Sequence, residues 1–161
     1  MIDPQNIDFH EIARRGDTEV MGVCLEAGLD PGLRDPGGHS LLMIAAYNDQ
    51  PAMVELLLGR GADPNESGAR GTPLAGAVFK GNLEVVKALL EGGADPDLQN
   101  AAGGAALHFA VMFGQTEMVE LLLERGADPA LEDAEGRTPA AMARAQGQEE
   151  LARRLESGAT R

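Results

Sequence analysis

The side chains that could do chemistry in this chain are three histidines, one cysteine and 26 carboxylates. Histidine, cysteine and acidic side chains bind a metal ion when several of them converge, and paired acids can serve as general acid and base. A nucleophile needs a base within hydrogen-bonding distance. Each of these functions depends on convergence, so the placement of the groups along the chain decides between them.

The histidines are placed too far apart to share a metal ion or a substrate. His10 and His108 occupy equivalent positions three sequence repeats apart, which separates them by roughly 25 to 30 Å when each repeat adds the distance between packed helices. His39 stands beside two glycines, and we find no Cys, Glu or Asp at ligand spacing to it. We predict no metal site and no cofactor.

The carboxylates recur with a period instead of converging. Four aspartates hold the same loop position, where Asp forms turns by accepting backbone hydrogen bonds: Asp30, Asp63, Asp95 and Asp128. Five glutamates fall on the outer sides of expected helices: Glu55, Glu84, Glu117, Glu120 and Glu124. Cys24 lies in an apolar, helix-like run and is expected to be a buried, reduced thiol. We predict no catalytic residues, and so a protein that is not an enzyme.

Composition and charge limit the remaining classes of function. The 161 residues are 43% hydrophobic but only 3% aromatic, which favours one domain of closely packed helices. The net charge of -13 repels phosphate backbones and anionic lipids. We therefore expect no nucleic acid and no membrane partner, but a protein partner with a basic or neutral surface. We find no targeting leader and expect a cytoplasmic monomer.

Internal repetition is the strongest signal in the chain. The motif "GLDP" at 28–31 returns as "GADP" at 61–64, 93–96 and 126–129, in steps of 33, 32 and 33 residues. An apolar block with helical spacing precedes each copy, and a shorter helix precedes that block. Ser40, Thr72 and Thr138 are placed to cap these shorter helices, and Pro73 and Pro139 to occupy the first turn.

These units resemble ankyrin repeats, whose consensus runs G-x-T-P-L-H-x-A-A, a Gly turn, V-V-x-L-L-L and G-A-D. The resemblance covers nearly the whole chain and implies an all-α solenoid of stacked helix-turn-helix units with β-hairpin-like loops, here called fingers. It divides a single domain, 1–161, into five repeats at 1–34, 35–66, 67–99, 100–132 and 133–161, of which the first and last are caps. The composition is similar to that of bacterial ankyrin proteins, and we expect a complete, stand-alone chain.

The chain departs from the consensus in two ways. The family's capping Thr and loop-binding His never occur in the same repeat, so we expect the loops to be joined less tightly. The paired positions are Ser40 with Met43, Thr72 with Ala75, Ala105 with His108, and Thr138 with Ala141. The finger that enters the third repeat is one residue shorter than the others and holds Arg70 where the family has Gly. We expect its shape to differ.

The resemblance places partner contacts at the two residues that close each first helix and at the finger tips. The two rows read Arg14, Tyr47, Phe79, Met112, Ala145 and Arg15, Asn48, Lys80, Phe113, Gln146. Because interfaces concentrate aromatic residues and Met, we predict a binding stripe of Tyr47, Asn48, Phe79, Lys80, Met112 and Phe113, flanked by Arg14 and Arg15. His39, Arg70, Glu135 and Arg137 would form a polar rim.

The alternative is that the stripe only fills the space between helices and fingers, as we expect Phe9 and Phe109 to do. For the whole protein we predict a non-catalytic protein-interaction module that binds through its concave face, in the manner of an inhibitor or immunity protein. A structural or chaperone-like accessory subunit is the second class. An enzyme is the third, and it would require activity that depends on one acidic pair.

Overall fold

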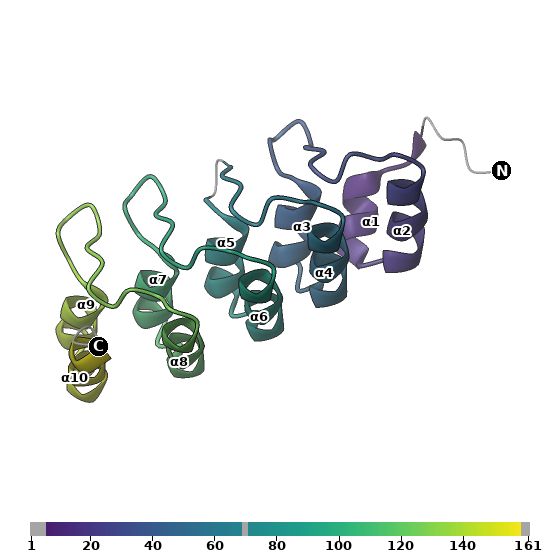
Figure 1. Ribbon diagram of the computed structural model, residues 1–161. Coiled ribbons are helices and arrows are strands. Elements are labelled where there is room, and N and C mark those ends of the chain that lie inside the picture. The colour runs from purple at the N-terminus through teal and green to yellow at the C-terminus, as the bar shows by residue number, and fades with distance from the viewer. Residues whose placement is uncertain (1–5, 69–70, 159–161) are drawn as a thin grey trace.

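The computed structural model describes residues 6–68 and 71–158. Two helices form each of the five units along this part of the chain. In chain order they are α1 (Phe9–Arg15), α2 (Thr18–Glu26), α3 (Leu41–Tyr47), α4 (Pro51–Gly59), α5 (Pro73–Lys80), α6 (Leu83–Glu91), α7 (Ala106–Met112), α8 (Thr116–Glu124), α9 (Pro139–Ala145) and α10 (Glu149–Gly158). Figure 1 shows the pairs stacked in one row, with the fingers projecting on one side. The predicted all-α solenoid is confirmed.

The first helices begin where the sequence predicts. Ser40, Thr72 and Thr138 each accept a hydrogen bond from the backbone N–H three residues on, at 3.0 to 3.2 Å. Ala105 has no hydroxyl, and the Nδ1 atom of His108 instead reaches back to accept from its N–H at 3.2 Å. The first helices α3, α5, α7 and α9 therefore each begin at a residue fixed by a hydrogen bond to a side chain.

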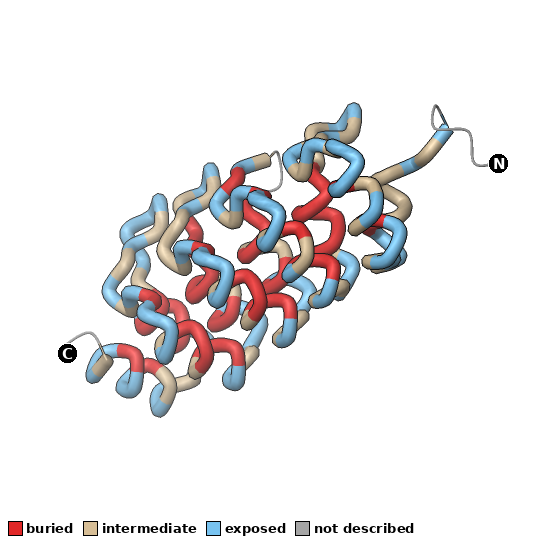
Figure 2. Tube along the Cα trace, turned by 45° about the vertical axis from the view of Figure 1, so that its right-hand side comes forward, coloured by how far each residue is buried: buried red, intermediate tan, exposed pale blue. Residues whose placement is uncertain are grey.

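The core is a continuous band along the stack (Figure 2). One Leu stands at the same place in each second helix and is buried in every repeat: Leu25, Leu57, Leu89, Leu122 and Leu155. Cys24, which we predicted to be buried, is only half-buried. It lies on α2, in the first repeat. Among the described residues, this repeat packs against one neighbour, the second repeat.

Side-chain amides join each repeat to the one before it. Three such groups stand just before a second helix and donate to a main-chain carbonyl of the preceding first helix: Gln50 to Arg14 at 3.1 Å, Asn82 to Ala46 at 3.1 Å and Gln115 to Val78 at 2.9 Å. These bonds hold neighbouring first helices in register close to the ends that carry the predicted contact positions.

The loops are tied by the recurring aspartates and by bridges between repeats. Asp30, Asp63, Asp95 and Asp128 each accept from the backbone N–H two residues further on, at 2.8 to 2.9 Å, as predicted. The Nδ1 atom of His108 is already an acceptor, so its Nε2 donates to the Arg137 carbonyl at 3.2 Å. Gln99 also donates to the Glu132 carbonyl at 2.7 Å. The consensus His therefore joins two loops at His108 even without the consensus Thr, and Gln99 adds a second bridge between loops.

The finger that enters the third repeat pairs its backbone differently from the finger before it. Gly68 and Gly71, three positions apart, exchange two backbone hydrogen bonds of 3.0 Å. In the preceding finger the backbone N–H of Asp35 donates to the carbonyl of His39, four residues on. Arg70, predicted as a contact in this finger, lies outside the described residues.

Candidate functional site

The groups that could do chemistry form at most small clusters in the part of the chain that the structure describes. There, no three His, Cys, Asp or Glu side chains are arranged to hold a metal ion. The prediction that His39 lacks an acidic neighbour is wrong, because the finger turn brings Asp35 to it with Nδ1 and Oδ1 3.2 Å apart. The backbone N–H of His39 also donates to this carboxylate at 2.8 Å and lowers the pKa of Asp35. The pair stabilises the turn.

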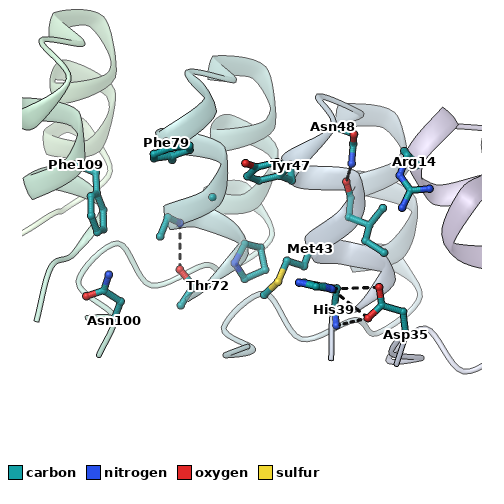
Figure 3. A pocket seen from close by; sticks show the side chains of 14 residues that line it. Arg14, Asp35, His39, Met43, Tyr47, Asn48, Thr72, Phe79, Asn100 and Phe109 are labelled. Atoms are coloured by element: carbon teal, nitrogen blue, oxygen red, sulfur yellow. Dashed lines mark hydrogen bonds and ion pairs between the residues drawn. The ribbon is translucent and has the colours of Figure 1, made fainter. Parts of the chain in front are cut away.

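A groove of about 540 Å³ lies between the fingers and the first helices, and we call it the inner groove (Figure 3). Its apolar walls come from Met43, Ile44, Tyr47, Pro73, Phe79 and Phe109. Its polar lining comes from Arg14, Asp35, His39, Asn48, Thr72 and Asn100. The residues span four repeats, so only the stacked array creates the site.

Small residues in the third repeat account for the hollow. Ala75 stands where the consensus has His, and Gly76 follows it in α5. A Cβ atom built on Gly76 would meet only the Tyr47 ring, at an ordinary 3.7 Å, so the space above this glycine is open. On the finger side a Cβ on Gly68 would come within 3.0 Å of the Met43 methyl, so Met43 lies directly against this short finger.

The predicted aromatic residues gather at the helix-end side of the groove. The rings of Phe79 and Phe113 pack edge to face with centroids 5.3 Å apart. Phe79, Met112 and Phe113 are 55%, 43% and 45% exposed. The Lys80 ammonium lies 4.9 Å from the centroid of the Tyr47 ring. We call Tyr47, Phe79 and Phe113 the aromatic cluster. Much of its apolar surface is in contact with solvent.

The cationic residues predicted to flank the stripe are engaged within the first repeat. Arg14 and Arg15 both form ion pairs with Glu11, the second at 2.7 Å. These bonds lower the pKa of Glu11. Arg14 also lines the inner groove, whereas Arg15 does not. The structure therefore brings Arg14 together with the aromatic residues and leaves Arg15 outside the groove.

Of the other predicted polar contacts, some line the inner groove and others lie outside it. Asn48 lines the groove, and its amide donates to the Ile44 carbonyl at 2.7 Å. Arg137 lies on a later finger, away from the groove lining, and pairs with Asp133 at 2.9 Å and with Glu135. Among the described residues of the predicted finger rim, only His39 lines the inner groove.

The sequence reasoning missed several groove residues. Phe109 was assigned to packing alone, yet its half-buried ring lies against Gly104 and also forms one wall of the groove. Asn100 and Thr72 reach the groove from the finger side (Figure 3). The signal that could have identified them is a pair of small residues: Ala75, at the position where the consensus has the larger His, and Gly76 next to it.

A buried acid lies at the base of the fingers, beside His39. Glu66 is 9% exposed, and the Ser40 hydroxyl donates to its carboxylate. The guanidinium of Arg34 lies 3.6 Å from its other oxygen. Burial raises the pKa of Glu66, and Arg34 opposes that rise only in part. The carboxylate joins one finger to the start of α3.

The geometry defines a class of protein, a helical solenoid with a groove between its first helices and its fingers. Comparison with known proteins agrees: the family described as "Ankyrin repeats (3 copies)" matches residues 9–100 and again 74–160. The chain therefore belongs to the ankyrin repeat family. Ankyrin repeats form a non-catalytic fold that generally mediates protein–protein interaction.

Curated relatives share this region as one part of longer chains. Over 84 residues the chain is 36% identical to a serine/threonine-protein kinase 12 of Arabidopsis thaliana, and over 98 residues 35% identical to the palmitoyltransferase ZDHHC13 of Homo sapiens. A putative ankyrin repeat-containing protein of Treponema pallidum is 32% identical over 86 residues. The matches cover 52%, 60% and 52% of this chain but 18%, 16% and 29% of those proteins.

The helices are short compared with the thickness of a membrane. Among the described residues, none forms a helix with the length and hydrophobicity needed to cross a bilayer. The longest helix, α10, has ten residues and carries acidic side chains in its first turn.

Proposed function

We propose that the protein binds a protein partner through the inner groove and the aromatic cluster, and acts by occupying that partner. The observation that carries the proposal is the exposure of Phe79, Met112 and Phe113 side by side on one face. Apolar and aromatic side chains left in water cost free energy that a partner recovers by covering them. Exposed apolar patches of this kind mark interaction sites.

Charge supports an inhibitor or immunity-type role. The net charge of -13 attracts a basic protein over several ångströms and repels an acidic one, so we propose a partner whose overall charge is basic or neutral. Occupying such a partner needs no catalytic group on this chain. We expect the protein to act as a monomer in the cytoplasm, and both points stay predictions.

The test compares how much partner protein two double variants capture. Phe79→Ala with Phe113→Ala removes the exposed aromatic pair, and Val20→Ala with Val23→Ala removes apolar side chains that are also exposed but lie on α2. Capture that is lost in the first variant and kept in the second supports the proposal. A drop in melting temperature with unchanged capture would show that the aromatic residues only stabilise the stack.

The properties of the captured complex also distinguish an inhibitor from an accessory subunit. An inhibitor binds one to one, loses affinity as salt increases, and reduces the activity of its target. A structural or chaperone-like accessory subunit instead co-purifies at fixed stoichiometry with an active complex. Native mass spectrometry and an activity assay of the captured protein distinguish these outcomes.

A further inference from the structure

We propose that the inner groove takes one large apolar side chain from an extended segment of the partner, and that Lys80 binds a carboxylate next to that side chain. The proposal rests on the proposed function and deepens it, because it names the chemistry of the segment. Three features of the described residues support it: an unpaired cation, unused hydrogen-bond donors, and the shape of the apolar surface.

Among the cations of the described residues, Lys80 is the one without an acidic partner. Every other Lys or Arg side chain of the described residues forms an ion pair, but Lys80 forms none. Its ammonium is held over the ring of Tyr47, which lines the groove. Lys80 is exposed in the free protein, and an ion pair with its ammonium becomes stronger when the bound segment excludes water from it.

The remaining polar groups of the groove favour an acceptor on the ligand. The Oδ1 atom of Asn100 accepts two backbone hydrogen bonds of 3.0 Å, while its amide nitrogen makes none within the described residues. The only acid that lines the groove, Asp35, is already bound by His39. Arg14 is likewise paired with Glu11. The amide nitrogen of Asn100 is therefore an unused donor, which suits a carboxylate or carbonyl oxygen. The Oδ1 atom of Asn48 is an acceptor and suits a backbone N–H of the segment.

The apolar surface has the shape for a peptide segment. A volume of about 540 Å³ holds a large side chain with part of its backbone, and also lies within the range of small-molecule sites, roughly 300 to 1,000 Å³. A small molecule in the groove would leave Met112 and Phe113 exposed, since neither lines it. A chain segment that enters the groove and continues over Phe79 would cover both.

The acidic character of the whole protein does not oppose this local contact. The exposed glutamates Glu55, Glu84, Glu117 and Glu124 lie on second helices, and no second-helix residue lines the groove. The long-range field therefore selects the overall charge of the partner, whereas Lys80 selects the group that lies next to it.

The experiment selects random peptides displayed on phage against the wild-type protein, and measures the affinity of the selected synthetic peptides for four variants. Lys80→Glu reverses the proposed contact, and Lys87→Glu makes the same change of net charge on α6, at a lysine already paired with Glu84. Gly76→Leu fills the groove, and Gly22→Leu adds the same side chain to α2, where the space is open.

We expect peptides with one large apolar residue close to an Asp or Glu. Their affinity should fall about tenfold with Lys80→Glu at low salt and about thirtyfold with Gly76→Leu, while both control variants bind within about twofold of wild type. Circular dichroism confirms that each variant is folded.

Lys/Arg-rich peptides, or peptides whose affinity is unaffected by both groove variants, would overturn the inference. So would a failure to select any peptide, or self-association of the protein that disappears with Gly76→Leu. The proposed function fails separately, when capture of the full-length partner is unaffected by Phe79→Ala with Phe113→Ala. Loss of that capture together with unchanged binding in Lys80→Glu and Gly76→Leu would retain the function and reject the groove contact.

Discussion

The ring of Phe113, at the end of α7, meets the ring of Phe79 on α5 edge to face, with centroids 5.3 Å apart. The contact joins the third and fourth repeats through two side chains that are each about half exposed. A contact of this kind adds little to stability, whereas the surface that it leaves in water is large. The pair is therefore better placed to bind a partner than to hold the stack together.

A double-mutant cycle measures how much the two rings stabilise the fold. We expect Phe79→Ala and Phe113→Ala to show a coupling energy of about 0.5 to 1.5 kcal/mol in urea denaturation, the usual range for an aromatic pair. A much larger coupling energy would mean that the rings belong to the core.

The amide bonds between repeats should contribute more than similar bonds within a repeat. Asn82→Ala leaves the Ala46 carbonyl of the previous helix without its donor, and we expect it to cost about 1 to 2 kcal/mol of unfolding free energy. Asn48→Ala removes a bond inside one repeat, made by a residue that is itself exposed, and should cost about 0.5 kcal/mol or less. Equal costs would show that the bond from Asn82 does not couple the repeats.

Glu66 should make the folded protein less stable as pH increases, the opposite of the usual effect of an acidic side chain. Its pKa is raised in the folded state, so between the unfolded value near 4.5 and the folded value the native protein binds more protons. Stability from this group is therefore lost as pH increases through that window. We expect the unfolding free energy of Glu66→Gln, relative to wild type, to increase from pH 4.5 to pH 7.

Asp133 provides the control of opposite sign. The backbone N–H of Arg137 lowers the pKa of Asp133, so its contribution is present above its unfolded value and lost as pH falls. Relative to wild type, Asp133→Asn should accordingly lower the unfolding free energy most near pH 7 and least in acid. A Glu66→Gln difference that follows the same trend as Asp133→Asn would contradict the burial of Glu66.

Two glycines of α5 should respond in opposite ways to alanine. Gly76 has ordinary helical geometry and open space above it, so Gly76→Ala should raise stability by about 0.5 to 1 kcal/mol. Gly81 ends the helix with φ at +72°, a left-handed conformation, so Gly81→Ala should lower stability by about 1 to 2 kcal/mol. Loss of stability in Gly76→Ala would mean that the groove above it is filled in solution.

The repeats, helix starts and loop aspartates could be predicted from the sequence because each depends on local chemistry. The hydroxyl of Thr72 caps its helix through a bond to a residue three positions away, and a side chain with a fixed offset leaves a signal in the sequence. The period then places Phe79 and Phe113 in neighbouring repeats without any coordinates.

The groove could not be predicted in the same way, because it depends on what is missing. Its lining includes Gly76, which has no side chain, and the small Ala75 beside it, and no motif records an empty space. The pairing of Glu66 with Ser40 joins residues 26 positions apart, and that of His39 with Asp35 depends on the turn between them. Such pairs appear only when the chain is folded.

The two lysines of the chain offer the most direct test of where the partner binds. Lys80 lies beside the inner groove and Lys87 on the second helix of the same repeat, so one acetylation experiment reports on both surfaces. The rate of acetylation of each lysine is measured by mass spectrometry, with and without the captured partner. We predict that the partner slows acetylation of Lys80 severalfold and leaves Lys87 unchanged. Protection of Lys87 with Lys80 still reactive would contradict binding at the inner groove.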